Sequence, residues 1–123
     1  MAFLTARKRA EGMGAAGGAT EAHWNMTISS VALAILTPLF ILSFGSTLGA
    51  PYEEVVAYYS RPYPAIVAAL FFAVGFMHFK NGVKVLIEDY VGGFAREVWI
   101  IAMTCLSYAA AAVALFAIAR LAL

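Results

Sequence analysis

Three long apolar segments dominate this sequence of 123 residues and limit what it can fold into. They cover about residues 26–48, 65–87 and 98–121, and each reaches the length of ~20 residues that a helix needs to cross a bilayer. Hydrophobic residues make up 63% of the chain and charged residues only 12%, whereas soluble domains are about half apolar and a quarter charged. A single soluble domain of this size could not bury so much apolar surface. We therefore expect an all-α membrane protein with three transmembrane helices.

The segment before the first span, residues 1–22, is polar and rich in glycine and alanine, and it begins with the basic cluster Arg7-Lys8-Arg9. Its glycines disfavour a stable helix. A signal peptide would place a short apolar core directly after the basic residues, but here the apolar segment begins late and has full length. We therefore expect a retained cytoplasmic tail, followed by a membrane domain of residues 23–123.

Basic residues also predict the orientation of the chain. They are concentrated in the tail and near the second connection, at Lys84 and Arg96, whereas the first loop and the C-terminus carry one each, Arg61 and Arg120. Since positive charge favours the cytoplasmic side, the tail and the second connection are expected there and the C-terminus on the outer side.

The first connection and the first span have features of their own. Residues 49–64 carry three prolines and four tyrosines, which suits an interfacial segment with a short helix around residues 53–59. Pro38 should kink the first span or remove one of its backbone hydrogen bonds. The hydroxyl residues of this span are compatible with contacts between helices, and they are Ser29, Ser30, Thr37 and Ser43.

The second span changes character at its middle, because residues 75–90 add a histidine, two lysines, two acids and a tyrosine to an apolar region. At about 100° per residue, one helix face carries Phe71, Gly75, His78, Gly82, Val85 and Asp89. A glycine on each side of an imidazole leaves room for something flat and broad. A neutral imidazole inside the membrane can bind a metal, for which haem iron is the natural candidate. A histidine that is only hydrogen-bonded to a neighbouring helix fits the spacing equally well.

Other polar residues of this stretch carry further hypotheses. Tyr90 follows His78 by about three turns, or ~18 Å along the axis, and its phenol could donate a hydrogen bond to a carbonyl of a membrane-soluble quinone. Spacing alone favours a plain interfacial tyrosine. Lys84 can reach Glu88 at i+4, while Lys80 lies deeper, where we expect a partner or an anionic ligand group.

Residues 78–90, His-Phe-Lys-Asn-Gly-Val-Lys-Val-Leu-Ile-Glu-Asp-Tyr, resemble the histidine–glycine–Asp-Tyr motif of the hydrophobic membrane anchor subunits of succinate dehydrogenase, the smaller anchor of respiratory complex II. His23-Trp24, the following Ser-Val-Ala-Leu and Pro38 resemble the first span of the alphaproteobacterial form. The similarity covers nearly all of residues 21–123. It implies that the three helices form half of a heterodimeric haem-binding anchor bundle in a bacterial inner membrane.

The resemblance also implies roles for individual residues. His78 would be an axial ligand of the haem b iron, with Gly75 and Gly82 packed against the haem, and Tyr90 with Asp89 would form part of the ubiquinone site. The second axial ligand would come from the cytochrome b anchor subunit, because only one histidine of this chain lies inside a span. Succinate would be oxidised on a flavoprotein subunit, with electrons arriving through an iron–sulfur subunit. This chain has no flavin, nucleotide or cluster motif, and no catalytic residue is expected in it.

One position departs from the family pattern. Many members carry an arginine early in the first span, near the haem propionates, where this chain has Thr27. We expect the partner chain to supply that pairing, because Lys80 lies away from the His78 face.

Two other functions remain open from the residues alone. In the first, the chain is a cofactor-free structural or assembly subunit of a respiratory complex, and His78 only packs. In the second, polar residues of the second span form a relay that conducts ions or protons. Such a relay needs polar residues through the whole bilayer, and residues 65–77 provide none. A net charge of +1 argues against nucleic acid as a partner.

Overall fold

The structure is a computed structural model that describes residues 5–12 and 18–123. This part of the chain is helical and contains no strand. Its elements are α1 (Ala6–Glu11), α2 (Gly18–Gly45), α3 (Tyr52–Tyr59), α4 (Pro62–Tyr90) and α5 (Gly93–Ala122). The segments Thr20–Gly45, Pro62–Tyr90 and Gly93–Ala122 are long and apolar enough to cross a membrane, which confirms the expected fold of three transmembrane helices.

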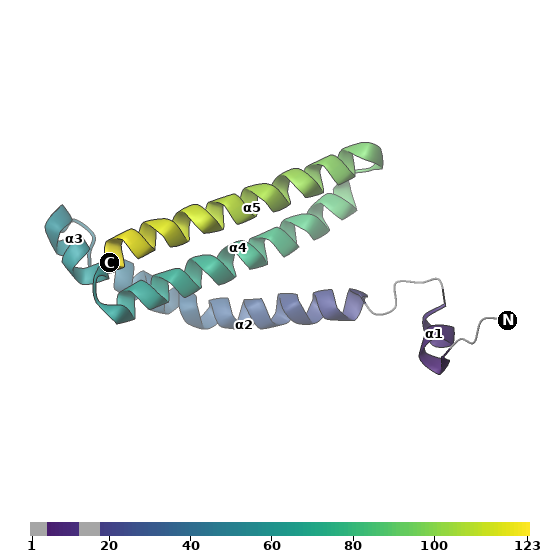
Figure 1. The fold of residues 1–123 in the computed structure, drawn as a ribbon, viewed down its shortest axis with the longest axis horizontal. Coiled ribbons are helices and arrows are strands. Elements are labelled where there is room, and N and C mark those ends of the chain that lie inside the picture. Colours follow the sequence, from purple (N-terminus) through teal and green to yellow (C-terminus); the bar gives the residue numbers. More distant parts are fainter. Residues whose placement is uncertain (1–4, 13–17) are drawn as a thin grey trace.

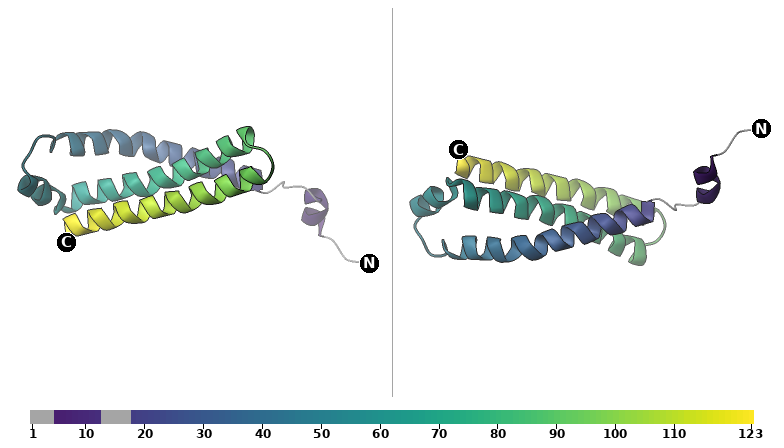
Figure 2. Two further views of the ribbon diagram at one scale, coloured as in Figure 1. Left: turned by 90° about the horizontal axis from the view of Figure 1, so that it is seen from above. Right: turned by 90° about the horizontal axis from the view of Figure 1, so that it is seen from below.

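The long helices form a layer with α4 in the middle (Figure 2). Among the described residues, α4 packs against both α2 and α5, whereas α2 and α5 do not contact each other. α1 and the α4–α5 connection lie at one end of the layer, and α3 and the C-terminus lie at the other (Figure 1). Because α4 has neighbours on two sides, it contributes most of the buried apolar residues, which are Pro64, Ala65, Val67, Ala68 and Ile87. Large apolar side chains of α2 and α5 face outward, as lipid-facing surfaces require.

The helices extend past the expected spans except at the end of α2. This helix ends at Gly45 rather than at residue 48. The hydroxyls of Ser46 and Thr47 donate to the carbonyls of the preceding turn at 2.7 and 2.8 Å. Gly49 then reverses the chain with a φ of 81°, a conformation that costs glycine little. α2 runs through Pro38, which lacks the N–H that would bond the carbonyl of Ala34.

The N-terminal segment is more helical than we expected from its glycines. Residues 6–11 form α1, where the Thr5 hydroxyl accepts a hydrogen bond from the Lys8 N–H at 3.2 Å and so caps the first turn. α2 already begins at Gly18, within the expected tail. Gly14 and Gly17 lie outside the described residues.

Aromatic rings hold α2 against α4 in the half of the layer nearer α3. Phe40 of α2 stacks on Phe71 of α4 with ring centroids 4.3 Å apart and 3° between the planes. It also meets Phe72 edge to face at 5.5 Å. Pairs of this kind contribute about 0.5–1.5 kcal/mol each beyond the area that they bury. The register between α2 and α4 is therefore set by bulky rings in this half.

The short helix expected around residues 53–59 is confirmed as α3, and tyrosines attach it to the bundle. The Tyr58 hydroxyl lies 3.2 Å from Ser43 Oγ at the end of α2, and this hydrogen bond lowers the pKa of Tyr58. Tyr59 is buried, and burial raises the pKa of its phenol. α3 also packs against α4 and α5, so it closes the end of the layer opposite α1.

Candidate functional site

His78 lies in the middle of α4 and is directed at α2. Its Nδ1 atom is 2.9 Å from Ser29 Oγ. The Ser29 hydroxyl has a second contact, because it donates to the carbonyl of Met26 at 2.9 Å. A polar pair therefore joins the two helices in the half of the layer away from the phenylalanine rings.

The second ring nitrogen of His78 has no hydrogen bond to any described residue. Nor do the described side chains include a fully buried nitrogen or oxygen without a partner. Nε2 of His78 is therefore unpaired but not sealed inside the bundle. An imidazole nitrogen of this kind can bind a metal or accept a hydrogen bond from a group outside the chain.

Gly75 and Gly82 lie on the same side of α4 as His78, as the helical spacing predicts. A Cβ atom at Gly82 would lie 3.4 Å from Met26 Cε, and one at Gly75 would lie 4.0 Å from Leu33 Cδ2. Both glycines thus allow α2 to approach α4 closely on either side of the histidine. The nearest atoms to this face within the chain are side chains of α2.

An apolar hollow of about 260 Å³ lies on the flank of α4 beside this face. Gly75 lines it together with four phenylalanines, which are Phe71, Phe72, Phe76 and Phe79. The hollow lies within one turn of His78 along the helix, since Gly75 precedes the histidine by three residues. Its lining suits a flat apolar group better than a polar one.

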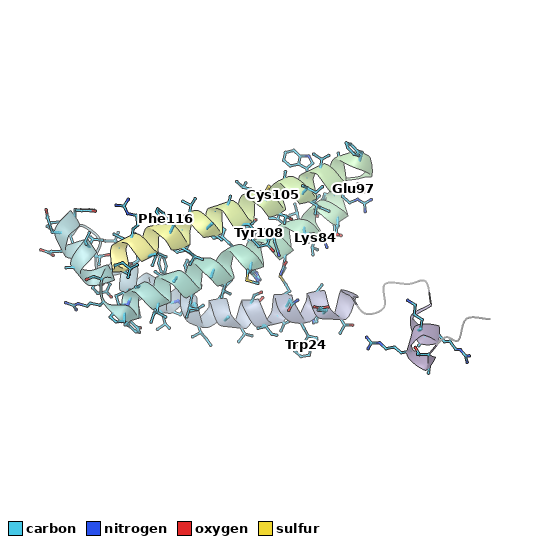
Figure 3. The ribbon with its side chains drawn as sticks, viewed as in Figure 1. Trp24, Lys84, Glu97, Cys105, Tyr108 and Phe116 are labelled. Carbon is cyan, nitrogen blue, oxygen red and sulfur yellow. The ribbon has the colours of Figure 1, made fainter. Side chains whose placement is uncertain are left out.

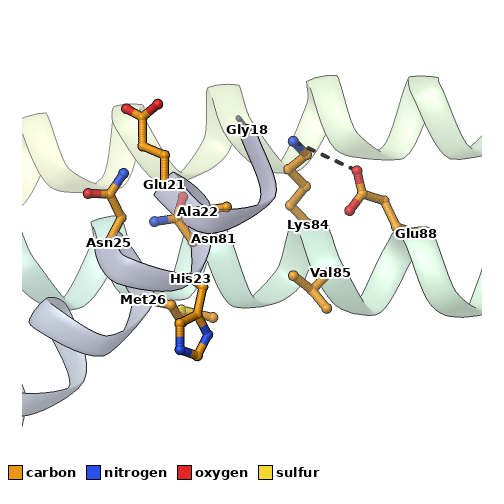
Figure 4. A pocket seen from close by; sticks show the side chains of 10 residues that line it. All are labelled: Gly18, Glu21, Ala22, His23, Asn25, Met26, Asn81, Lys84, Val85 and Glu88. Carbon is orange, nitrogen blue, oxygen red and sulfur yellow. Dashed lines mark ion pairs between the residues drawn. The ribbon is translucent and has the colours of Figure 1, made fainter. Parts of the chain in front are cut away.

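A larger cleft of about 580 Å³ opens between the beginning of α2 and the last turns of α4 (Figure 4). Its polar lining residues are Glu21, His23, Asn25, Asn81, Lys84 and Glu88. Lys84 Nζ and Glu88 Oε1 are 3.7 Å apart, which confirms the expected i,i+4 pair. Both side chains are exposed, so this ion pair contributes little to stability.

Asp89 and Tyr90 end α4 and point to no described partner. Tyr90 is 82% exposed, Asp89 is exposed, and neither side chain has a hydrogen bond to the described part of the chain. They lie beyond the residues that line the cleft and about three turns from His78. The structure therefore places Asp89 and Tyr90 next to each other and away from His78.

Lys80 belongs to the opposite side of α4, where it meets α5. Its Nζ donates to the Tyr108 hydroxyl at 3.0 Å and lies 4.9 Å from the centre of the tyrosine ring. Figure 3 shows Tyr108 between α5 and α4. This contact supplies the partner that a deep lysine was expected to need. It also separates Lys80 from His78, so the structure does not join the two residues into a relay.

Ser29 of α2 and Tyr108 of α5 are the neighbouring-helix partners of His78 and Lys80. Sequence reasoning assigned neither of these hydroxyl residues a specific partner. Both carry hydroxyls inside apolar spans, which is the signal that could have drawn attention to them. Among the described residues, no group of three or more histidines, cysteines or acids could hold a metal ion by itself. A metal at His78 would therefore need its other ligands from outside the described chain.

Comparisons with known proteins agree with a chain that spans a membrane. The family described as succinate dehydrogenase/fumarate reductase transmembrane subunit matches residues 1–119. A protein of Paracoccus denitrificans, named succinate dehydrogenase hydrophobic membrane anchor subunit, is 43% identical over 123 residues, which are 100% of this chain and 95% of the relative. No solved structure matches the chain significantly. The chain therefore belongs to the family of transmembrane subunits of succinate dehydrogenase and fumarate reductase.

Proposed function

We propose that this chain is the membrane anchor subunit of a succinate:ubiquinone oxidoreductase, where it supplies one axial ligand of haem b and part of the ubiquinone site. The observation that carries the proposal is the histidine of α4. His78 lies in a membrane-spanning helix, has one nitrogen held by Ser29 and keeps the other unpaired. An ionisable residue in such a position marks a functional site by default.

The residues around His78 fit a haem. Nε2 is an imidazole nitrogen that is open to a group outside the chain, and haem iron is commonly held by histidine. The hollow at Gly75 offers phenylalanine rings to an apolar macrocycle, while Gly82 lets α2 approach α4 beside the ligand. A bound haem would supply one-electron redox chemistry within the complex.

The remaining parts of the haem site are proposed to come from other chains. The chain has two histidines, and His23 lies at the beginning of α2 in the polar cleft rather than beside His78. The second axial ligand is therefore assigned to the cytochrome b anchor subunit. Thr27, at the position of the family arginine, donates its hydroxyl to the carbonyl of His23 at 2.9 Å, so the pairing with the propionates is also assigned to that partner.

Tyr90 and Asp89 are proposed to contribute to the ubiquinone site. The phenol of Tyr90 is exposed and has no hydrogen-bond partner in the described chain, so its O–H is available to a quinone carbonyl. Asp89 is adjacent and is also exposed. Succinate oxidation is assigned to the flavoprotein subunit, with electrons arriving through the iron–sulfur subunit, and this chain holds the site in the membrane.

The orientation follows from the ends of the layer. α1, with its basic residues, and the α4–α5 connection lie at the same end (Figure 1), and this end also holds Tyr90. By the charge rule we place it on the cytoplasmic side of a bacterial inner membrane, with the C-terminus in the periplasm. The quinone site is then on the side where soluble subunits can dock.

A cofactor-free structural or assembly subunit is the alternative, and the contact between Ser29 and His78 favours it. A histidine bonded to a neighbouring helix can serve packing alone. Under this alternative the second nitrogen needs no ligand, and loss of the imidazole would leave the spectrum of the complex unchanged.

The two functions are separated by the absorption and electron paramagnetic resonance spectra of the purified complex. We expect His78→Ala to remove or perturb the low-spin bis-imidazole haem signal while the complex still assembles. His23→Ala is the matched control, because it removes the other imidazole of the chain, which lies in the polar cleft. We expect this variant to keep the haem signal. An unchanged bis-imidazole spectrum in His78→Ala would exclude the ligand role.

A further inference from the structure

We propose that Ser29 is a positioning residue for His78: its hydroxyl oxygen accepts the Nδ1 proton and thereby presents Nε2, with its lone pair, to the iron. This inference rests on the proposed role of His78 as a haem ligand. Under this inference, α2 carries no residue that binds the iron, but it controls the orientation of the ligating histidine of α4.

The number of protons on the serine hydroxyl determines the direction of the hydrogen bond. A hydroxyl has one proton to donate and two lone pairs to accept with. Ser29 donates its proton to the Met26 carbonyl at 2.9 Å, so toward His78 it acts as an acceptor. The contact of 2.9 Å between Ser29 Oγ and Nδ1 then requires the proton on Nδ1. In a neutral imidazole the remaining nitrogen, Nε2, is the deprotonated one.

This arrangement matters for a ligand because the nitrogen opposite the metal controls the ring. An acceptor on the far N–H fixes the tautomer, limits rotation of the ring and raises the basicity of the ligating nitrogen. The acceptor here belongs to a different helix, so the orientation of the imidazole depends on how α2 packs against α4. The close approach at Gly82 and Gly75 brings the serine within reach.

Ser30 shows that the contact is specific to one of two adjacent hydroxyls. It also donates to the Met26 carbonyl, at 2.8 Å, but it is exposed and has no contact with His78 among the described residues. Ser29 is half-buried at the helix interface. The two serines therefore lie on the same helix and donate to the same backbone carbonyl. They differ only in that Ser29 contacts the imidazole of His78.

The test compares Ser29→Ala with Ser30→Ala in the complete purified complex. Three quantities are measured: haem content, the resonance g values of the low-spin haem, and its midpoint potential. Without the acceptor, the imidazole donates less charge to the iron and stabilises the oxidised form less. We expect Ser29→Ala to raise the midpoint potential, shift the g values and weaken haem binding by about tenfold, the lower end for loss of such a partner. Ser30→Ala should match the wild type.

A second pair keeps the test valid if alanine disturbs helix packing. Ser29→Thr and Ser29→Val have nearly the same shape, and only the threonine retains a hydroxyl. We expect the threonine variant to keep the wild-type potential and the valine variant to show the raised one. A common shift in both would show that volume, rather than the acceptor, is responsible and would overturn the inference.

The outcomes also distinguish this inference from the proposed function. If His78→Ala keeps the bis-imidazole spectrum, the ligand role itself fails. If His78→Ala loses that spectrum while Ser29→Ala and Ser29→Val keep the wild-type potential and g values, the ligand role stands and the positioning role of Ser29 is wrong.

Discussion

The two sides of α4 each provide a hydrogen-bond partner for an ionisable side chain, but they do so in different surroundings. On each side an ionisable residue inside the membrane-spanning layer meets a hydroxyl of the neighbouring helix. His78 contacts Ser29 of α2 at 2.9 Å, and Lys80 contacts Tyr108 of α5 at 3.0 Å. The histidine is flanked by glycines, whereas the lysine lies over an aromatic ring. One helix therefore carries two polar contacts of similar length with different surroundings.

The difference shows which residue is available to an external group. The ammonium of Lys80 receives both a hydroxyl acceptor and the face of the Tyr108 ring from within the chain. The imidazole of His78 has one hydrogen-bond partner, Ser29, and its second nitrogen has none among the described residues. A polar residue inside a membrane helix thus indicates function most strongly when its own chain leaves part of it unsatisfied. By this criterion we propose that the α2 side of α4 carries the functional site and that the contact on the α5 side is structural.

The largest effect should come from filling the α2 side with Gly82→Leu. The added side chain must displace Met26, whose Cε would lie 3.4 Å from the first added carbon, and overpacking of this kind costs about 1–3 kcal/mol. We expect a corresponding loss of haem occupancy, measured as haem per assembled complex. Membrane insertion should not suffer, because leucine is favourable both in helices and in lipid.

Ser107→Leu is the matched substitution on the α5 side. Ser107 is 3% exposed, so a leucine there also overpacks a helix interface, but it does so away from His78. We expect weaker thermal stability with nearly normal haem content. Equal haem loss in both variants would mean that the two sides of α4 are not distinct, and full haem in Gly82→Leu would assign the glycine to another purpose.

A smaller effect is expected from Tyr90→Phe. Tyr90 lies at the end of α4 and belongs to neither of the two sides. The substitution keeps the ring and removes one neutral hydrogen bond, worth about 0.5–1.5 kcal/mol net. Quinone reductase activity should fall, while succinate oxidation by a soluble artificial acceptor and the haem spectrum should be preserved. The ratio of the two activities in membranes measures this, and a constant ratio would leave Tyr90 as an interfacial anchor.

The smallest effect should be the coupling between Lys80 and Tyr108. A double-mutant cycle with Lys80→Met and Tyr108→Phe isolates their interaction, and polar contacts between membrane helices average about 0.6 kcal/mol in such cycles. We expect a coupling of that order in thermal unfolding of the complex. The haem potential should be unchanged in each variant, and a shift like that expected for Ser29→Ala would place Lys80 within the haem environment.

Much of the fold could be predicted from the sequence because membrane spans are set by length and composition. The three transmembrane helices, the short helix at residues 53–59 and the pair of Lys84 with Glu88 were predicted and are confirmed, and so is the resemblance to the family. The boundaries of the helices were predicted less well, because they depend on local capping hydrogen bonds. The hydroxyls at Ser46 and Thr47, which precede the turn at Gly49, end α2 before the apolar run is complete.

The partners of the candidate site could not be predicted, because periodicity within one helix does not say which helix lies opposite. The spacing places Gly75, His78 and Gly82 on one face, but either α2 or α5 could have covered it. In the structure α2 covers this face, and its Phe40 stacks on Phe71 of α4, a contact between residues far apart in the sequence. The roles of His78, Tyr90 and Asp89 as ligand and quinone residues remain proposals for the experiments above.

The separation of α2 from α5 bears on how the complex is put together. Of the long helices, α2 and α5 cover α4 on two sides. Under the proposed function, a second anchor subunit would contact α4 across the broad surface of the layer without separating any helix pair. Two subunits of this kind could insert into the membrane independently, fold separately and then assemble through these surfaces. If the proposed haem site is correct, haem would bind at the interface between two subunits that are already folded, and haem binding would then depend on their correct pairing.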